Sequence, residues 1–187
     1  MMRKLFIALL LPLVAFCVGC NNNGKKADTA TEQKEANVDA ADSTVYGVCG
    51  EGTAMHTLQL ITDTGDTIEY ALIGHDDTES EVTGGLMCGD RLAVMAQSTD
   101  EGLVANKVIN LTSLMGRWTS IDKNFVIEEG GIVSSNVKAE SHPWTNWKIF
   151  NGQLLLNRDT FDVVQLGSDS LAIENAKGIF VFKRQLQ

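Results

Sequence analysis

From residue 45 to the end of the chain, apolar and polar residues alternate in short runs separated by turn residues, and no long amphipathic helix interrupts them. Such alternation is typical of strands with one buried face. In residues 45–113 the pattern predicts five strands, at Thr44–Val48, Thr57–Thr62, Thr67–Ile73, Arg91–Gln97 and Leu103–Asn110. A long polar connection, residues 74–85, separates the third strand from the fourth.

The strand-like runs after residue 113 are shorter and more evenly spaced. The pattern predicts eight of them, at Arg117–Ile121, Asn124–Glu128, Ile132–Lys138, Thr145–Phe150, Gln153–Asn157, Asp162–Leu166, Ser170–Glu174 and Gly178–Lys183. Asn151-Gly152, between two apolar runs, is the strongest hairpin signal in the chain.

These two runs of strands predict an all-β fold with two small antiparallel barrels. Five strands with the long connection after the third favour an OB-like barrel in residues 45–113. Eight strands in sequence order favour an up-and-down barrel in residues 114–187. The boundary between the two domains is expected at Leu111–Leu114.

The start of the chain has a different pattern. Arg3 and Lys4 precede the apolar run Leu5–Val18, which is shorter than the ~20 residues that a membrane-spanning helix needs. A basic head, a short apolar centre and a small residue before a break predict a secretory signal peptide, residues 1–19.

The residues at the end of this signal resemble a bacterial lipobox. Val18-Gly19-Cys20 matches its end, although Cys17 stands where the lipobox usually has leucine. The resemblance implies cleavage before Cys20 and acylation of Cys20, palmitate included; the alternative is ordinary secretion with a free Cys20. In either case Cys17 is removed, so we do not expect the C-x-x-C to act in redox or zinc chemistry.

Residues 20–44 are expected to form a flexible tether. They contain one valine and no aromatic residue, so they cannot bury enough surface to offset the entropy of ordering. Some bacterial lipoproteins carry an acidic run just after the anchor cysteine that directs them to the cell surface. No acidic residue lies in Asn21–Lys26, so the comparison with those lipoproteins favours the periplasmic side of the outer membrane. We therefore expect a lipid-anchored protein of the bacterial cell envelope.

Charge differs between the two predicted barrels. Residues 45–113 hold two basic and eleven acidic residues, a net charge of −9, whereas residues 114–187 hold eight of each. The aromatic residues of the acidic half are only Tyr46 and Tyr70. Nucleic-acid binding needs basic grooves and stacking rings, so no nucleic-acid partner is expected.

Two features of the second predicted barrel resemble the small lipocalin-like domains of bacterial lipoproteins. Gly116-Arg117-Trp118 opens its first strand, and residues 147–156 have the sequence WKIFNGQLLL. In that family a G-x-W begins the barrel and a tryptophan-led hairpin lies in its middle. The resemblance covers residues 114–187 and implies a lipocalin-like calyx with a small apolar or amphipathic ligand.

Whether this barrel holds a ligand depends on what fills it. Strands of five or six residues are ~17–20 Å long, and eight of them enclose a space for either side chains or one small ligand. The candidate pocket residues are Trp118, Phe125, His142, Trp144, Trp147 and Phe150. A pocket with its mouth at Ser141–Trp144 and a solid aromatic core both stay open on the sequence alone.

Trp118 and Arg184 are expected to close one end of the barrel. In Gly178–Arg184, alternation puts Phe180, Phe182 and Arg184 on one face. If the two phenylalanines point inward, Arg184 reaches the barrel floor, where its guanidinium can stack on Trp118.

Cys49 and Cys88 lie beside the first and fourth predicted strands, which are neighbours in an OB barrel. Export permits oxidation. A disulfide would close a loop of about forty residues and stabilise the fold by ~3–4 kcal/mol in the chain-entropy model. The alternative is two separate buried thiols, which behave as small hydrophobes.

The titratable residues form no recognisable catalytic or metal-binding pattern. The segment HDDTESE, residues 75–81, is more typical of a solvated acidic loop than of a calcium loop with regular ligand spacing. The sequence contains no Ser/His/Asp order with a nucleophile elbow and no carboxylate pair in a recognisable frame. We therefore expect no metal, no cofactor and no enzyme activity.

Two functions are compatible with these features. The first is a lipid-anchored envelope lipoprotein whose lipocalin-like barrel binds a small apolar or amphipathic ligand. The alternative is a non-catalytic interaction or stress-sensing protein with a filled barrel and a protein partner that the sequence does not identify. The pair of barrels also resembles copper and envelope-stress lipoproteins, but those have the reverse barrel order and a C-x-x-C in the mature chain.

Overall fold

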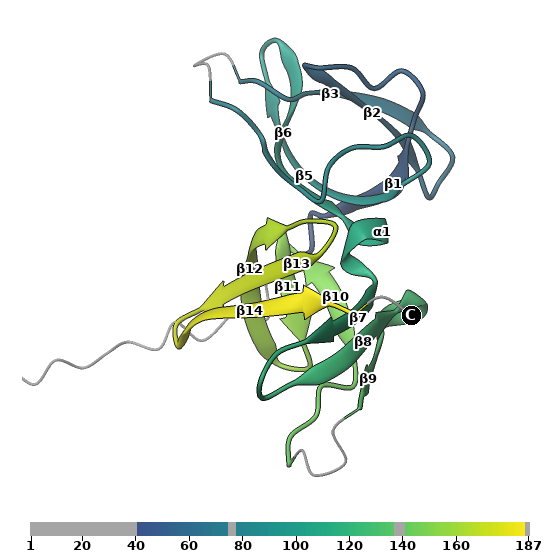
Figure 1. Ribbon diagram of the computed structural model, residues 1–187. Helices are drawn as coiled ribbons and strands as arrows, with labels where there is room; N and C mark the ends of the chain where they lie inside the picture. The colour runs from purple at the N-terminus through teal and green to yellow at the C-terminus, as the bar shows by residue number, and fades with distance from the viewer. Residues whose placement is uncertain (1–40, 75–77, 137–140, 186–187) are drawn as a thin grey trace, which may run out of the picture. The chain divides into compact units, whose positions relative to one another are not determined.

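The structure is a computed structural model that describes residues 41–74, 78–136 and 141–185, and these belong to one compact unit. The described chain is all-β and forms two barrels, as the sequence predicts (Figure 1). The predicted signal peptide, Cys17, Cys20 and most of the predicted tether lie outside the described residues. No helix in the described ranges has the length and apolar character needed to span a bilayer.

The first barrel is built from a six-stranded sheet. Its strands are β1 (Val45–Cys49), β2 (Thr57–Thr62), β3 (Thr67–Ala71), β4 (Glu81–Thr83), β5 (Arg91–Thr99) and β6 (Gly102–Asn110). Five of them close a ring in the order β1-β2-β3-β6-β5 and back to β1. The β3–β6 pair is parallel and the other pairs of the ring are antiparallel. This is the topology of the expected OB-like barrel.

One strand of this barrel was not predicted. β4 lies inside the polar connection after the third strand and pairs in parallel with β6, where Val82 is opposite Val108. Three residues are too few to show an alternating pattern, so the sequence gives no signal for it. The pairing covers an edge of β6 that would otherwise be exposed.

The core of the first barrel is mainly aliphatic. Its buried residues are Cys49, Leu58, Leu60, Tyr70, Leu72, Leu92, Val94, Ala105 and Val108. Gly47 allows β1 to lie close to β2, because a Cβ at this position would be 2.4 Å from the carbonyl oxygen of Ile61. A glycine in a strand interior often marks such a close approach.

A short helix, α1 (Leu111–Leu114), follows β6 at the expected boundary. The buried Asn110 side chain ends the strand and caps the helix by accepting a hydrogen bond from the amide of Ser113 at 2.8 Å. Its Nδ2 donates to the Asp90 carboxylate at 2.6 Å and to the Gly85 carbonyl at 3.0 Å. Asn110 therefore connects the end of β6, the segment of Gly85 and the segment of Asp90 to α1, which leads into the second barrel.

The second barrel has the eight predicted strands. They are β7 (Gly116–Thr119), β8 (Asn124–Glu128), β9 (Ile132–Ser135), β10 (Trp147–Phe150), β11 (Gln153–Leu156), β12 (Asp159–Leu166), β13 (Ser170–Asn175) and β14 (Gly178–Arg184), with the 3₁₀ turn η1 (Glu129–Gly131) before β9. Strands adjacent in sequence pair antiparallel except β9 and β10, which are the two ends of the sheet, and β14 pairs with β7. Among the described residues, a bridge from Ile132 of β9 to Asn146, just before β10, links these two ends, so the up-and-down barrel is nearly closed.

The predicted hairpin at Asn151-Gly152 joins β10 to β11. Both residues have positive φ, 48° for Asn151 and 72° for Gly152. A two-residue turn of the I′ type requires this conformation and favours Asn-Gly for that reason.

The two barrels share part of their packing. Ala93 and Ile109 of the first barrel, with Leu111 and Leu114 of α1, belong to the same buried cluster as the interior of the second barrel. The Tyr46 hydroxyl on β1 also donates to the carbonyl of Ile149 on β10 at 2.6 Å. No strand of one barrel pairs with a strand of the other among the described residues.

Candidate functional site

The interior of the second barrel is filled by its own side chains. Phe125 contacts Trp144 and Phe182 edge to face, with ring centroids 5.1 Å apart in each pair. Phe161 packs against Trp144 in the same manner at 5.8 Å. Aliphatic side chains complete this core: Ile127, Ile149, Leu154, Leu156, Val163, Leu171 and Ile173. Edge-to-face rings at this spacing stabilise one another, and these rings contact each other in the part of the barrel where a calyx would hold its ligand.

Trp144 covers one end of the barrel. It comes from the segment expected to form the mouth of a pocket, but its side chain is turned inward and is only 8% exposed. Lys123, from the turn between β7 and β8, lies against its ring, with Nζ 4.1 Å from the centroid. This cation–π contact holds the ring in place over the core.

The structure does not bring the six predicted pocket residues together at one place. Trp118, Phe125 and Trp144 are buried in the core. The other three lie outside it, on the surface or partly buried: His142, Trp147 and Phe150. The Trp147 indole donates to the carbonyl of Glu128 at 2.7 Å, which fixes the ring against the end of β8.

The structure does bring Trp118 and Arg184 together, at the end of the barrel next to α1. Arg184 Cζ lies 4.2 Å from the centroid of the Trp118 ring, and the indole donates to the carbonyl of Leu114 at 2.8 Å. The guanidinium also donates to three backbone carbonyls, those of Ser113, Met115 and Ser168. Burial lowers the pKa of Arg184, and these carbonyls and the ring replace part of the water that the cation loses.

Gly116, two residues before Trp118, makes room for this arrangement. A Cβ at Gly116 would lie 2.4 Å from Arg184 Nη1, and the residue has a φ of 134°, which side chains rarely adopt. The glycine of the G-x-W pattern therefore has a physical role, because it allows the guanidinium to reach the carbonyls beyond it.

Cys49 and Cys88 are separate thiols in the structure, the first buried and the second exposed. The segments that carry them are adjacent, because the amide of Gly89 donates to the carbonyl of Cys49 at 2.9 Å. The Cys49 sulfur lies 3.3 Å from Thr53 Oγ1. The two cysteines form no disulfide in the structure, and only one of the two thiols is buried, whereas the alternative raised by the sequence was two buried thiols.

A cleft of about 530 Å³ lies where the two barrels meet, and we call it the junction cleft. Its apolar lining consists of Tyr46, Leu111, Met115, Trp147 and Ile149, and its charged residues are Arg91, Glu129 and Lys148. Burial, together with the nearby Asp42 carboxylate, raises the pKa of Tyr46 to about 12, so its hydroxyl stays protonated and bonded to Ile149. The junction cleft thus combines apolar surface with charges of both signs.

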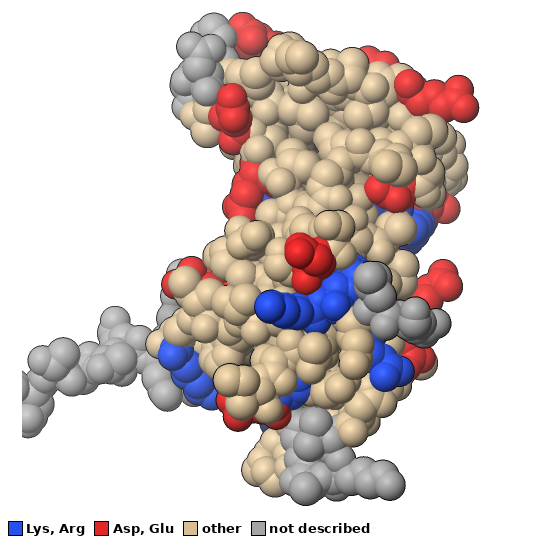
Figure 2. Space-filling model, in the orientation of Figure 1, with Lys and Arg blue, Asp and Glu red and all other residues tan. Residues whose placement is uncertain are grey.

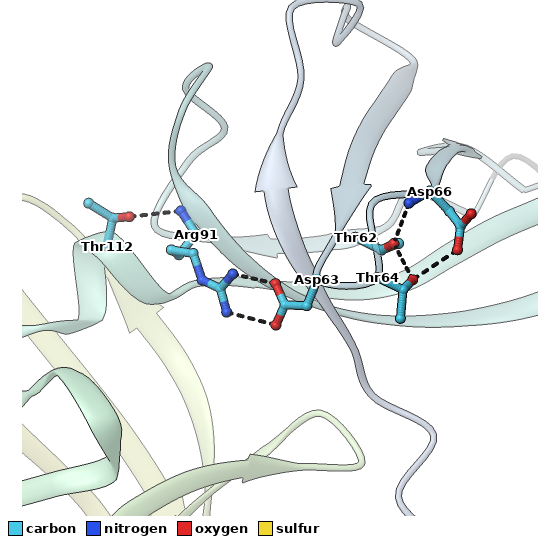
Figure 3. Close-up of polar contacts among 6 residues, drawn as sticks. All are labelled: Thr62, Asp63, Thr64, Asp66, Arg91 and Thr112. Atoms are coloured by element: carbon cyan, nitrogen blue, oxygen red, sulfur yellow. Dashed lines mark hydrogen bonds and ion pairs between the residues drawn. The ribbon is translucent and has the colours of Figure 1, made fainter.

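Arg91 in the junction cleft already has a partner within the protein. Figure 3 shows its guanidinium facing the Asp63 carboxylate through two hydrogen bonds, of which Nη2 to Oδ2 measures 3.1 Å. Hydrogen bonds from Arg91 hold the pKa of Asp63 below its ordinary value. The turn that carries Asp63 is braced by hydrogen bonds among Thr62, Thr64 and Asp66 (Figure 3). The pair is exposed, so it orients Arg91 more than it stabilises the fold.

A second groove, of about 640 Å³, lies beside β14, and we call it the β14 groove. It is lined on one side by Thr119–Lys123 and on the other by Ile179–Lys183. Ile179 and Val181 are 61% and 60% exposed, and Ile121 on the opposite side is fully exposed. Apolar side chains gathered in this way on a surface often mark an interaction site.

The sequence prediction missed the β14 groove. The alternation in β14 correctly located Phe182 and Arg184 on the inward face, while Phe180 lies at its rim and is 36% exposed. The same alternation puts Ile179 and Val181 on the outward face. Two β-branched apolar residues on a solvent-facing strand were the available signal.

Charge follows the division seen in the sequence. On the face drawn in Figure 2, acidic side chains predominate over the first barrel, whereas both signs appear over the second. In the described ranges, no group of three His, Cys, Asp or Glu side chains is placed to hold a metal ion. His75, Asp76 and Asp77 of the acidic loop lie outside those ranges.

Comparisons with protein-family models, curated proteins and solved structures found no match. The function is therefore argued from the geometry of the barrel interior, the junction cleft and the β14 groove.

Proposed function

We propose that the chain is a lipid-anchored protein of the bacterial cell envelope that binds a protein partner on its surface, without catalysis and without a ligand inside its second barrel. The observation that carries this proposal is the filled interior of the second barrel. Phe125, Trp144, Phe161 and Phe182 contact one another at the centre, so the residues that would line a calyx contact each other instead.

The anchoring part of the proposal depends on the sequence before the first barrel. An acylated Cys20 would attach the chain to the membrane, and the residues between Cys20 and Asp42 would let the barrels stand away from it. Asp42 and Ser43, at the end of the expected tether, are hydrogen-bonded to Asn151 of the second barrel and belong to the folded part. Labelled palmitate should enter the protein in cells, and Cys20→Ala should abolish both the label and membrane association. Membrane association that persists in Cys20→Ala would contradict the anchor.

A second candidate function is supported by the junction cleft. Its apolar residues and charged neighbours suit a small amphipathic molecule, which was the first function expected from the sequence. In this version the ligand binds between the barrels and the second barrel stays filled.

A titration of the full-length protein with a fluorescent polyene fatty acid separates these functions, with tryptophan emission as the readout. The proposed function predicts no saturable binding. Saturable binding that is lost in Trp147→Ala, which truncates a side chain of the junction cleft, would favour the second candidate. Binding that survives Trp147→Ala and quenches the buried tryptophans would indicate a ligand in the barrel interior and would contradict both.

A further inference from the structure

We infer that the open edge of β14 binds an extended segment of a protein partner, apolar in its middle and acidic at its ends, as an added strand of the second barrel. This inference rests on the proposed function, because it names the surface and the class of partner. It depends on the backbone pairing of β14, on its outward side chains and on the charges at its two ends.

The backbone of β14 is paired along one side and open along half of the other. β13 pairs with β14 continuously from Gly178 to Lys183. β7 pairs with it only at Lys183 and Arg184, because β7 ends at Thr119. The residues after Thr119 line the opposite side of the β14 groove. The first half of β14 is therefore an edge strand.

The hydrogen bonds at the end of β14 show which residues face this open side. The amide of Arg184 donates toward β13, to the carbonyl of Asp169 at 2.7 Å, and the next amide donates toward β7, to the carbonyl of Arg117 at 2.9 Å. Backbone groups alternate in direction along a strand. Ile179 and Val181 consequently direct their N–H and C=O groups into the β14 groove, where no described residue pairs with them.

A further strand beside β14 would also give apolar contacts to the outward side chains of the same two residues. Ile179 and Val181 are more than half exposed, and they lie on one face of β14 with Ile121 across the groove. An added strand would bond the open backbone groups and bring apolar side chains beside these three. Main-chain bonding with apolar contacts at alternate positions is the general mode of recognition by strand addition.

The charges on β14 distinguish a partner strand from a second copy of this chain. Lys177 and Lys183 lie at the two ends of the open edge, and no acidic residue lies between them. In antiparallel self-pairing centred on Phe180, each Lys183 would approach Lys177 of the other copy, and like charges opposite one another are destabilising. A partner strand with acidic ends would instead pair favourably with both lysines.

The surroundings do not reverse this preference. Lys123 and Asp122 line the opposite side of the β14 groove, and Glu174 lies on β13 opposite Ile179. These three charges sum to −1, which is smaller in magnitude than the +2 of Lys177 and Lys183. The two lysines at the ends of the edge therefore decide which strand is accepted.

The test uses fluorescently labelled peptides and the full-length protein, with fluorescence anisotropy as the readout. The probes are ETVTVTE and the matched peptide KTVTVTK. We expect the acidic peptide to bind about tenfold or more tightly than the basic one, and to weaken as salt is added. Failure of both peptides to bind, or equal binding of the two, would overturn the inference.

Two variants test whether the peptide pairs with the β14 edge. Val181→Pro removes an N–H that faces the groove and leaves the β13 side paired, because proline is tolerated where the N–H of an edge strand does not serve the ladder. Ile179→Glu replaces an apolar contact on the outward face by a carboxylate that repels the acidic ends of the probe, and it keeps the backbone intact. Both should weaken binding of ETVTVTE about tenfold or more.

The matched control is Ile61→Glu on β2, where the isoleucine is 42% exposed but its strand is paired on both sides. Binding that is unchanged in Val181→Pro and Ile179→Glu, or reduced equally in Ile61→Glu, would contradict the β14 site. Tryptophan emission verifies folding of each variant. A dimer seen by sedimentation and lost in Val181→Pro would assign the edge to a second copy instead.

Failure of this inference is distinguishable from failure of the proposed function. If the fatty-acid probe shows no saturable binding and no peptide binds, the proposed function stands and the β14 edge is not its surface. If the fatty-acid probe enters the barrel, the proposed function fails whatever the peptides do.

Discussion

The two barrels consist of similar short strands but close in different ways. In the first, the parallel pair of β3 and β6 completes the ring, and β4 covers part of the remaining edge. In the second, β14 meets β7 at two residue pairs, and β9 is linked by a single described bridge to Asn146, just before β10. Closure removes the backbone groups that another chain can bind. The incompletely closed barrel is therefore the one that offers a surface for strand addition.

The two cores also differ in kind. The first is largely aliphatic around Leu58, Leu60 and Tyr70, whereas the second is centred on edge-to-face rings. All three tryptophans lie in the second barrel and both tyrosines in the first. Intrinsic fluorescence can therefore follow each barrel separately, which makes the comparison experimentally accessible.

The largest effect is expected from truncating the aromatic core. Phe125→Ala removes a buried ring that contacts Trp144 and Phe182, and should lower the free energy of unfolding by ~3–5 kcal/mol. Because the buried cluster crosses the junction, tryptophan and tyrosine signals should shift together in a denaturant titration. A shift of the tryptophan transition alone would show that the barrels unfold independently, against the shared packing.

A smaller loss is expected at the closed end of the second barrel. Arg184→Ala removes three hydrogen bonds to carbonyls and the stacking on Trp118, and should cost ~2 kcal/mol and change the tryptophan emission. Arg158→Ala, at an exposed arginine in the turn before β12, is the control and should change neither. Unaltered stability and emission in Arg184→Ala would show that the pair does not close the barrel.

The contact between the barrels is tested by Tyr46→Phe. Loss of the hydrogen bond to Ile149 should cost ~1 kcal/mol near neutral pH. The folded protein raises the pKa of Tyr46 from 10.0 to about 12, so this stabilisation is complete below pH 10 and is lost as the pH rises toward 12. Urea titrations should show wild type losing stability relative to Tyr46→Phe across that window. If the free energies of unfolding of the two proteins change with pH in parallel, the Tyr46 phenol is not buried and hydrogen-bonded.

The smallest effect is expected at the exposed pair on the first barrel. Asp63→Asn should lower the free energy of unfolding by no more than ~0.5 kcal/mol, and less in high salt. Because Arg91 lowers the pKa of Asp63 below 3.8, the contribution of the pair is present above that pH and is lost as the pH falls through the folded value. A loss of several kcal/mol in thermal or urea unfolding would mean that Arg91 and Asp63 matter more to the barrel than their exposure implies.

The fold was largely predictable because strand alternation and turn residues act locally. All eight strands of the second barrel and the Asn151-Gly152 hairpin were predicted. β4 was not, because a three-residue strand depends on β6 for its existence. The residues of the candidate surfaces were harder to predict. Whether Trp144 lines a pocket or fills it, and whether Val181 has a neighbouring strand, depends on pairings between distant segments that composition does not encode.

Native mass spectrometry of the full-length protein, extracted from its membrane in mild detergent, tests the central claim of a filled second barrel most directly. We predict the mass of the acylated polypeptide alone, both for wild type and for Trp147→Ala. An additional small molecule retained by wild type and by Trp147→Ala, whose removal changes the emission of the buried tryptophans, would contradict the claim.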